Sequence, residues 1–458
     1  MSFSSPVMDL DELEHVLDGA LVRPSSPGWD AARAAWQLAV DQRPYAVVLA
    51  ASARDVVATV EAAARLGLRV APQATGHNAA PLGPLGRTIL LRTSAMRGVE
   101  IDAGRQVARV EAGALWADVT AAAAVHGLTG LAGSAPDVGV VGYTLGGGLS
   151  WFARLHGLAA NHVLSADIVT ADGEPRTIDA TRDAALFWAI RGGGGGFGVV
   201  TALEFRLFPI TEVHAGMLLW PIERAAEVLG AWWEWARSVP ETVTSLGRLL
   251  RLPPIPQIPE PLRGRSFVAV EAACLLDPAT ADLLLAPLRA LGPEMDTVRP
   301  TPITELGALH MDPQEPTPVT GDGLQLAGFP PAALEALLRV AGPGADVPLL
   351  TIELRHLGGA LAYGQQGGGA VSGMDAAIAV FSGGITPDAD AAAAVHVALD
   401  EVGAALAPWR AETAYRNFTE RSGPRFDRLE THIRLQRIKA AYDPADLIHA
   451  NHPVTPAG

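Results

Sequence analysis

Cysteine and lysine are almost absent from this chain. Its 458 residues include one cysteine, Cys274, and one lysine, Lys439. A single cysteine excludes an intrachain disulfide framework and CxxC redox or metal motifs. A single lysine that follows no glycine loop argues against a Walker nucleotide site and against Schiff-base catalysis. The sequence contains no HExxH motif and no close His/carboxylate cluster, so we expect no metal.

Positive charge and long apolar runs are also scarce. The net charge of −15 argues against a nucleic-acid or anionic-membrane partner, because such partners need a basic patch. The longest apolar run, near residues 47–52, has the length of a strand, so no membrane span is expected. The N-terminus has neither a basic region before an apolar core nor an early Arg pair. These features predict a cytoplasmic protein of two or three domains.

Glycine, by contrast, is abundant and gathers in two clusters. Residues 133–149 read GSAPDVGVVGYTLGGGL and contain six glycines without a Lys or Arg, and residues 191–198 read RGGGGGFG. Glycine allows positive φ and a very close approach to the backbone. Bare peptide N–H groups can then line an anion site without a basic side chain. The first cluster therefore predicts a phosphate-binding loop, with an ordinary glycine-rich surface loop as the alternative.

The segment before the first glycine cluster has the pattern of a β-α-β unit. A strand at 45–50 precedes a helix that begins after Ser52 and ends at Gly67, and a second strand follows at 68–72. We expect the two strands to be parallel neighbours. The second strand leads into Thr75-Gly76-His77-Asn78, at the strand end where α/β folds place ligands. The residues alone leave His77 open as a ligand contact or as a capping histidine.

After about residue 209 the sequence alternates strands and helices with long Pro- and Gly-rich loops. This pattern of elements favours an antiparallel sheet covered by helices on one face, with loops that supply substrate contacts. The predicted strands are 214–220, 266–276, 348–356 and 376–382, and the predicted helices are 223–237, 279–291, 331–340 and 388–407. The tail is polar, with a helix expected at 426–442.

Several motifs occur in one order along the chain: TGH at 75–77, VGVVGYTLGGGL, FWAIRGGGGGFGVVTALEFRLFP, IELRHLGGAL, YRNF and YDPADLIHANHP. With these motifs the chain resembles the FAD-linked oxidases of the vanillyl-alcohol oxidase (PCMH-type) fold, most closely the bacterial berberine-bridge-enzyme-like branch. The resemblance implies an α+β fold. It places a PCMH-type FAD-binding domain at 1–208, an inserted substrate-binding domain at 209–410, and a tail at 411–458 that returns to the FAD domain.

The resemblance also implies roles for single residues. His77 would bond the 8α-methyl of the flavin, residues 135–149 would wrap the pyrophosphate and ring, and Asn417 would approach the flavin from the tail. The FAD-binding residues predicted in this way are Thr75, Gly76, His77, Asn78, Ser134, Ala135, Asp137, Val138, Gly139, Gly142, Tyr143, Gly146, Gly147, Gly148, Leu149, Gly193, Gly196, Phe197, Gly198, Val199 and Asn417.

Three departures from the family pattern concern the chemistry. Doubly linked relatives have a cysteine at the position of Ala135, so we expect a single covalent link. Phe418 stands where many relatives have a tyrosine, and strand 376–385 lacks the carboxylate base of the plant enzyme. The remaining catalytic candidates are Tyr415, His356 and Tyr143. We expect Tyr415 or His356 to be the base and Tyr143 to stack near the ring.

The side chains of strand 348–356 alternate between the two faces of the sheet, which limits the residues that can face the flavin. Glu353 and Arg355 face one way and His356 faces the other, so only one set can reach the flavin. We expect Glu353 and Arg355 to form a structural ion pair.

The resemblance thus predicts an FAD-dependent oxidase that passes electrons from a small organic substrate to O₂. We expect a monomer or homodimer. A role in secondary metabolism is expected because it is common in this family. Two alternatives keep the fold: a cyclisation, rearrangement or non-redox tailoring enzyme, and a non-catalytic ligand-binding relative. An NAD-binding Rossmann enzyme is disfavoured, because the spacing is GxxGxxxGGG rather than GxGxxG.

Overall fold

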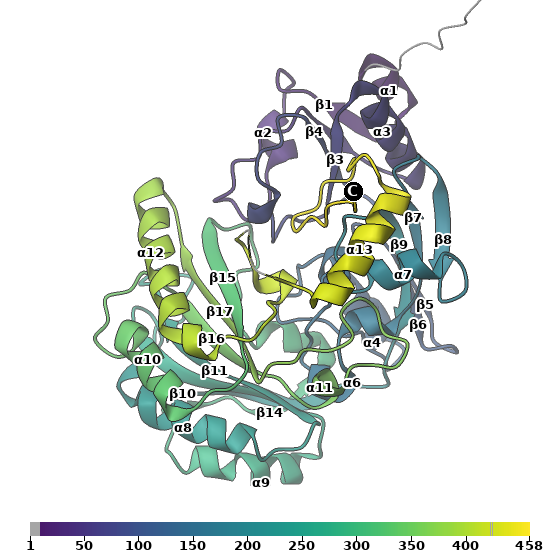
Figure 1. Cartoon of the computed structure of the whole chain (residues 1–458). Coiled ribbons are helices and arrows are strands. Elements are labelled where there is room, and N and C mark those ends of the chain that lie inside the picture. Colours follow the sequence, from purple (N-terminus) through teal and green to yellow (C-terminus); the bar gives the residue numbers. More distant parts are fainter. Residues whose placement is uncertain (1–9, 422, 424) are drawn as a thin grey trace, which may run out of the picture.

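Three β-sheets organise the chain, and each is built from its own stretch of sequence (Figure 1). The structure is a computed structural model that describes residues 10–421, 423 and 425–458. The first sheet has the strand order β1-β2-β4-β3. Its strands are β1 (Ala20–Val22), β2 (Ala46–Leu49), β3 (Arg69–Gln73) and β4 (Thr88–Arg92). Helix α1 (Leu10–Val16) precedes this sheet in the chain.

The β-α-β unit forms, but its two strands are not neighbours as expected. Strand β4 lies between β2 and β3 and pairs in parallel with both. The local pattern sets the direction of each strand, whereas the order depends on where the next strand inserts. Helix α3 (Ala53–Leu66) connects β2 to β3, with Ser52 at its N-cap and Gly67 in the left-handed conformation at its C-cap. Glycine takes this conformation without steric strain.

The second sheet is formed by the part of the chain that contains both glycine clusters. Its order is β5-β6-β9-β7-β8, and every pair is antiparallel. The strands are β5 (Val99–Asp102), β6 (Val107–Glu111), β7 (Val163–Val169), β8 (Pro175–Asp179) and β9 (Val199–Arg206). The helices within this part are α4 (Trp116–Ala124), α5 (Val140–Leu145), α6 (Ala153–His156) and α7 (Ala184–Ile190).

The C-terminal tail returns to the second sheet. Its helix α13 (Leu429–Tyr442) packs beside α7, although more than 200 residues separate them (Figure 1). The Lys439 ammonium group holds the tail there, because it donates to the carbonyl of Gly196 at 2.6 Å and pairs with buried Asp443.

The third sheet is entirely antiparallel and lies between residues 212 and 385. Its order is β13-β10-β12-β11-β16-β17-β15, with β14 also paired to β10. Four of its strands were not predicted: β11 (Val243–Arg251), β13 (Met295–Asp296), β14 (Arg299–Pro302) and β15 (Val319–Leu326). The four predicted strands are β10 (Glu212–Pro221), β12 (Ser266–Cys274), β16 (Thr351–His356) and β17 (Ile378–Ile385).

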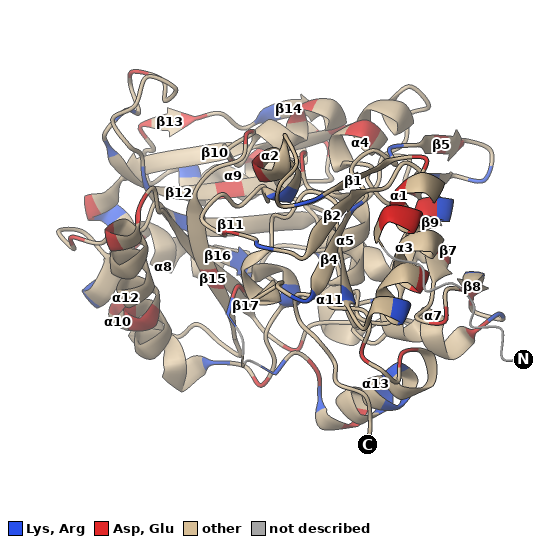
Figure 2. Ribbon diagram, turned by 90° about the horizontal axis from the view of Figure 1, so that it is seen from above, with Lys and Arg blue, Asp and Glu red and all other residues tan. Residues whose placement is uncertain are grey.

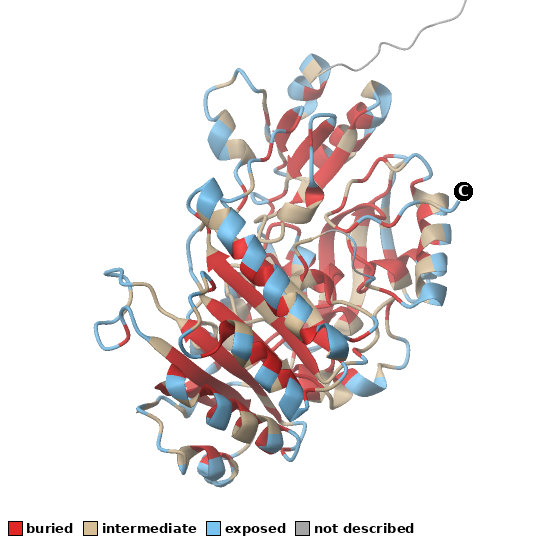
Figure 3. Ribbon diagram, turned by 60° about the vertical axis from the view of Figure 1, so that its left-hand side comes forward, coloured by how far each residue is buried: buried red, intermediate tan, exposed pale blue. Residues whose placement is uncertain are grey.

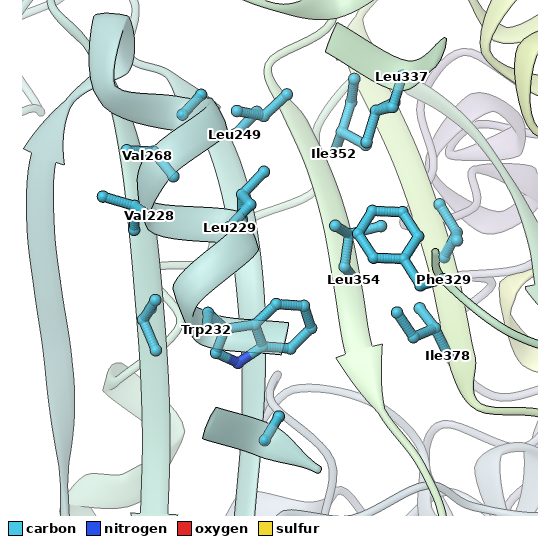
Figure 4. Close-up of a cluster of buried hydrophobic side chains, with 14 of the residues drawn as sticks. Val228, Leu229, Trp232, Leu249, Val268, Phe329, Leu337, Ile352, Leu354 and Ile378 are labelled. Carbon is cyan, nitrogen blue, oxygen red and sulfur yellow. The ribbon is translucent and has the colours of Figure 1, made fainter. Parts of the chain in front are cut away.

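Helices cover one face of the third sheet, and the other face turns towards the first two sheets (Figures 1 and 3). The covering helices are α8 (Ala225–Ala236), α9 (Pro278–Arg289), α10 (Pro331–Ala341) and α12 (Ala389–Leu406). The close-up in Figure 4 shows Val228, Leu229 and Trp232 of α8 packed over Leu249 and Val268 of the sheet. This burial fixes the sheet, so that its free face can carry polar side chains into the interior.

One helix among the described residues, α12, is apolar over much of its length. The segment Ala389–Trp409 is long and apolar enough to span a membrane by length and composition, with a mean hydropathy of 1.2. Its inward residues, among them Val395 and Leu406, pack into the core of the third sheet. Figure 2 shows acidic residues on α12, and both acidic and basic residues on α13.

Candidate active site

A cavity of about 770 Å³ lies where the three sheets and the tail meet. One wall comes from the loop after β3 and from the first glycine cluster. The opposite wall is the free face of the third sheet, and the tail residues 415–420 close it from the side. The cavity therefore joins almost every motif on which the resemblance rests.

His77 lies on the first wall with its ring held on three sides. The ring stacks on Trp36 with a centroid distance of 4.2 Å, and Nδ1 lies 2.8 Å from the Thr75 hydroxyl. Nε2 lies 3.5 Å from Asp137 Oδ1, and both atoms are buried without a hydrogen-bond partner in the described part of the chain. Asp137 is itself fixed by the Trp36 indole N–H at 2.6 Å. A fixed ring with an unpartnered nitrogen is suited to react with or bind another group.

The backbone of this wall also has free donors. Within the described residues, the peptide N–H groups of 75–79, 134–135 and 137–139 donate to no acceptor. A Cβ at Gly142 would meet nothing within 4 Å, whereas a Cβ at Gly146 would lie 1.8 Å from the Asn417 amide oxygen. Free N–H groups beside open space form a cradle for an anion such as a pyrophosphate. The residues present therefore fit a phosphate-containing cofactor.

The second glycine cluster contributes fewer of its predicted residues to the cavity lining than expected. Of its predicted residues, Gly198 lines the cavity, together with Gly194 and Gly195, which were not predicted. Phe197 and Val199 are buried in the core, and Gly193 lies against a helix carbonyl. The remaining predicted residues outside the lining are Asp137, Gly147, Gly148 and Gly196. Close packing explains Gly147 and Gly148, where an added Cβ would lie 3.3 Å and 2.6 Å from a neighbouring side chain. The sequence alone cannot show whether a glycine makes room for a ligand or for another segment of the same chain.

The three catalytic candidates have different surroundings. Tyr415 lines the cavity, where its hydroxyl oxygen accepts from the Leu149 N–H at 2.9 Å and from the Asn417 amide at 3.0 Å. Burial raises the pKa of Tyr415 to about 12, so its proton remains available to donate. Tyr143 donates instead to the carbonyl of Leu131 at 2.9 Å. Its hydroxyl is therefore already engaged.

The structure places His356 outside the cavity. It lies on the covered face of β16, edge-on to Trp233 at 5.9 Å, and burial lowers its pKa to about 3. The predicted alternation is present, and Glu353 and Arg355 are the residues that face the cavity. Because His356 does not reach the cavity, it cannot act as the base there.

Five charged groups form a buried network on this wall. His310 lies between two carboxylates, with Nδ1 2.6 Å from Glu271 and Nε2 2.9 Å from Glu353. Arg248 pairs with Glu271 at 3.1 Å, and Arg355 pairs with Glu353 at 2.9 Å. The two carboxylates raise the pKa of His310 to about 9 against the effect of burial and Arg248. Among the described residues, no group of three or more His, Cys, Asp or Glu side chains is arranged to hold a metal ion.

Glu420 is a second acid on the cavity wall. Its Oε2 accepts from the Gln37 amide at 2.7 Å and from the Gly321 N–H at 2.9 Å. Burial raises the pKa of Glu420 to about 7. Its Oε1 has no hydrogen-bond partner among the residues that the structure describes, and it is not sealed from the cavity. Glu420 can therefore exchange a proton near neutral pH.

Residues 44–179 match the protein-family model described as an FAD binding domain. This chain contains an FAD-binding domain. The domain carries the His77 loop and the first glycine cluster, in agreement with the cradle described above. Cys274 lies elsewhere, buried in β12, and burial raises its pKa to about 12.

Curated relatives share the FAD-binding part of the chain. The (R)-6-hydroxynicotine oxidase of Paenarthrobacter nicotinovorans is 33% identical over 44% of this chain and 45% of that protein. The glucooligosaccharide oxidase of Sarocladium strictum is 32% identical over 46% of this chain and 44% of that protein. The chain thus matches about half the length of these curated relatives.

Solved structures match over nearly the whole chain. The wild-type BBE-like 1 protein of Physcomitrella patens has a TM-score of 0.86 at 18% identity, covering 98% of this chain and 99% of that one. The 6-hydroxy-D-nicotine oxidase of Arthrobacter nicotinovorans has a TM-score of 0.84 at 23% identity, covering both chains fully. Together with the FAD-binding domain, these matches give the chain the vanillyl-alcohol oxidase (PCMH-type) fold.

Several residues of the cavity wall and of the ion-pair network joined to it were not found from the sequence. Arg248 lies on the unpredicted strand β11, Glu271 on a strand read only as core, and His310 and Glu420 in loops. The only sequence signal for the network was the pair Glu353 and Arg355, and it was interpreted as structural. A charged residue within an apolar strand, such as Glu271, is a signal that could have been followed further.

Proposed function

We propose that the protein is an FAD-dependent oxidoreductase that oxidises a small organic substrate, with its flavin linked covalently to His77. The observation that carries this proposal is the His77 ring with its unpartnered Nε2 beside a cradle of free peptide N–H groups. The FAD-binding domain and the oxidase relatives support the same class of activity.

Each part of the cavity has a role in this proposal. Bound FAD supplies a two-electron acceptor for a hydride. The N–H groups of 75–79, 134–135 and 137–139 bind its phosphates, and His77 anchors it. Tyr415 donates its hydroxyl proton to the substrate, since both other hydrogen bonds at its oxygen are made. Glu420 accepts the proton that a hydroxyl substrate releases.

We expect a single covalent link to the flavin, because no cysteine is placed to form a second one. Ala135 has no reactive atom, and Cys274 is buried in the core of the third sheet away from the cavity lining. A buried thiol with a raised pKa is a poor nucleophile.

Acid denaturation tests the linkage without any knowledge of the substrate. Flavin colour should stay with the denatured wild-type protein and be lost from His77→Ala. His126→Ala, an exposed histidine outside the cavity lining, is the matched control and should keep its colour. Release of flavin from the wild type would remove the role of His77, and a protein without flavin would favour a non-catalytic ligand-binding function.

Reoxidation tests whether O₂ is the acceptor. The flavin-loaded protein is photoreduced with EDTA and light, then exposed to air. Rapid return of the oxidised absorbance supports an oxidase. A reduced form that persists in air would favour another acceptor or a flavin-dependent rearrangement.

A further inference from the structure

The guanidinium group of Arg355 occupies a defined place in the cavity. Strand β16 directs it into the cavity, and its plane lies over the ring of Phe418 at 5.1 Å. Nε donates to Glu353 at 2.9 Å, and Nη2 donates to the hydroxyl of Ser134 at 3.1 Å. These contacts from two walls fix the group in orientation, so it spans the space between the sheet and the glycine cluster.

Arg355 still has donors to offer. In the part of the chain that the structure describes, its Nη1 donates to no group, and the same holds for Nη2 of Arg248. Neither atom is among the buried polar atoms that are sealed without a partner. Arg248 and Arg355 come from neighbouring strands, and each has a nitrogen 3.5 Å from His310. Two guanidinium groups thus present unused N–H groups to one cavity.

The carboxylates of the network leave one donor of Arg355 unused. Arg248, His310 and Arg355 are matched in charge by Glu271, Glu353 and Asp312, and the Nη1 of Arg355 bonds to none of these acids. Asp312 lies 3.8 Å from His310 Nε2 and is partly exposed, and Glu315, Arg416 and Glu420 also line the cavity. None of these acids forms an ion pair with Arg355.

A purely structural role for Arg355 would not explain its unused donors. Buried Arg154 shows the structural case, because it donates to the carbonyls of Leu357, Pro240 and Val243 and does not line the cavity. Arg355 instead keeps free donors in an enclosed space, where an unpaired cationic donor is unfavourable.

We propose that the cavity recognises a carboxylate group of its substrate through Arg355, with Arg248 beside it and with Glu353 and His310 as the positioning residues. The proposal rests on the function proposed above and names its substrate class, a small organic acid. Arginine suits this role because its planar fork pairs with a carboxylate in fixed geometry.

Three probes of similar shape and different charge test the proposal. Benzoate, benzamide and benzylammonium are titrated into the flavin-loaded protein, and binding is followed by the change in the flavin spectrum and by calorimetry. Benzoate should bind at least about ten-fold more tightly than benzamide, which matches one charge-assisted hydrogen bond. Arg355→Met should reduce this ratio to about one, and Arg355→Lys should keep part of it because the charge remains.

Arg265→Met is the matched control. Arg265 also lies over a phenylalanine ring, Phe267, and pairs with a carboxylate, Glu294, but it stands outside the cavity. This variant should keep the preference for benzoate. Flavin absorbance is recorded for every preparation, so a colourless wild type reports failure of the proposed function. A yellow wild type that does not bind benzoate, binds all three probes equally, or keeps its preference in Arg355→Met would overturn the carboxylate site.

Discussion

His310 Nε2 lies 2.9 Å from Glu353 Oε1, and both side chains are buried. Nδ1 of the same ring lies 2.6 Å from Glu271, so one imidazolium ring connects carboxylates from two strands of the third sheet. His310 belongs to the loop after the sheet's β14 edge strand. The protonated ring therefore ties this loop to the cavity wall and holds the carboxylate that orients Arg355.

This contact predicts that the folded protein loses stability as the pH rises above neutrality. The pKa of His310 is about 9 in the folded state against 6.5 in its ordinary state. The stabilisation is fully present below about pH 6.5 and is lost as the pH rises through 9, because only the folded state keeps the proton in this range. The loss amounts to about 3 kcal/mol. Urea unfolding followed by tryptophan fluorescence from pH 6 to about pH 9.5 measures it.

His310→Gln provides the comparison. Glutamine keeps hydrogen-bonding capacity but cannot titrate, so its unfolding free energy should change much less across the same range. A wild-type stability that is flat between pH 6.5 and 9 would contradict the protonated state assigned to His310.

Local patterns were sufficient for the part of the site that one segment builds. The sequence predicted the strand before His77, the end of α3 at Gly67 and the helix α12, because each depends on neighbouring residues. It also predicted that Glu353 and His356 face opposite ways, since alternation along a strand is a local property. The domain boundaries near 209 and 410 stay predictions.

The rest depends on contacts between distant segments. The order of β2, β4 and β3 is set by strand insertion, which no local pattern records. Strand β11 was missed because Gly247 interrupts its apolar pattern, and that glycine is required where a Cβ would lie 2.7 Å from Leu229. The His310 network joins residues up to 107 positions apart, from Arg248 to Arg355. Its charges compensate one another only after folding.

Glu420 predicts the pH dependence of turnover. If it accepts the substrate proton, kcat/KM should rise with pH around 7, the pKa that burial gives this carboxyl. Glu420→Gln should lower kcat by about 10² to 10⁴-fold and remove this titration. Glu412→Gln, an exposed acid paired with Arg425, should leave the profile unchanged.

Stability gives a readout of Glu420 that is independent of turnover. Its folded-state pKa is raised above the ordinary value of 4.5, so the folded state binds the proton more tightly. Its contribution is present below about pH 4.5 and lost as the pH rises through 7. Wild type should therefore lose stability in this window relative to Glu420→Gln. Identical slopes for the two proteins would show that the carboxyl is ionised throughout.

Two ion pairs with the same helical spacing should differ sharply in their contribution to stability. Lys439 and Asp443 are both buried, whereas Arg65 and Glu61 are both exposed, and each pair is four residues apart. Lys439→Met leaves the Asp443 charge buried with only two backbone N–H partners, at a cost of about 3 to 5 kcal/mol. Arg65→Met should cost less than about 0.5 kcal/mol.

Thermal unfolding of both variants measures this difference. Since Lys439 fastens the tail to the FAD-binding part, Lys439→Met should also release residues 429–458 to limited proteolysis. An equal effect of the two substitutions on the melting temperature would show that the buried pair does not stabilise the tail.

Gly142 predicts a separation of flavin binding from folding. It lies inside α5, and a Cβ there would meet nothing within 4 Å in the protein, although the residue lines the cavity. Alanine in a helix interior is favoured over glycine by about 0.5 to 1 kcal/mol, so Gly142→Ala should fold at least as well. If the open space is that of the flavin, the added methyl group should lower the flavin content of the purified protein. The ratio of flavin to protein absorbance measures it.

Substitutions at two further glycines show whether a loss of flavin comes from a clash with the flavin or from a disturbed fold. Gly230→Ala in α8 adds a methyl group at ordinary contact distance, 3.8 Å from Leu334, outside the cavity, and should keep both stability and flavin. Gly146→Ala should lose both, because its Cβ would collide with Asn417, which also bonds the backbone of Tyr143. Full flavin content in Gly142→Ala would place the cofactor away from α5, whereas loss of flavin with an unchanged melting temperature assigns the open space beside Gly142 to the flavin.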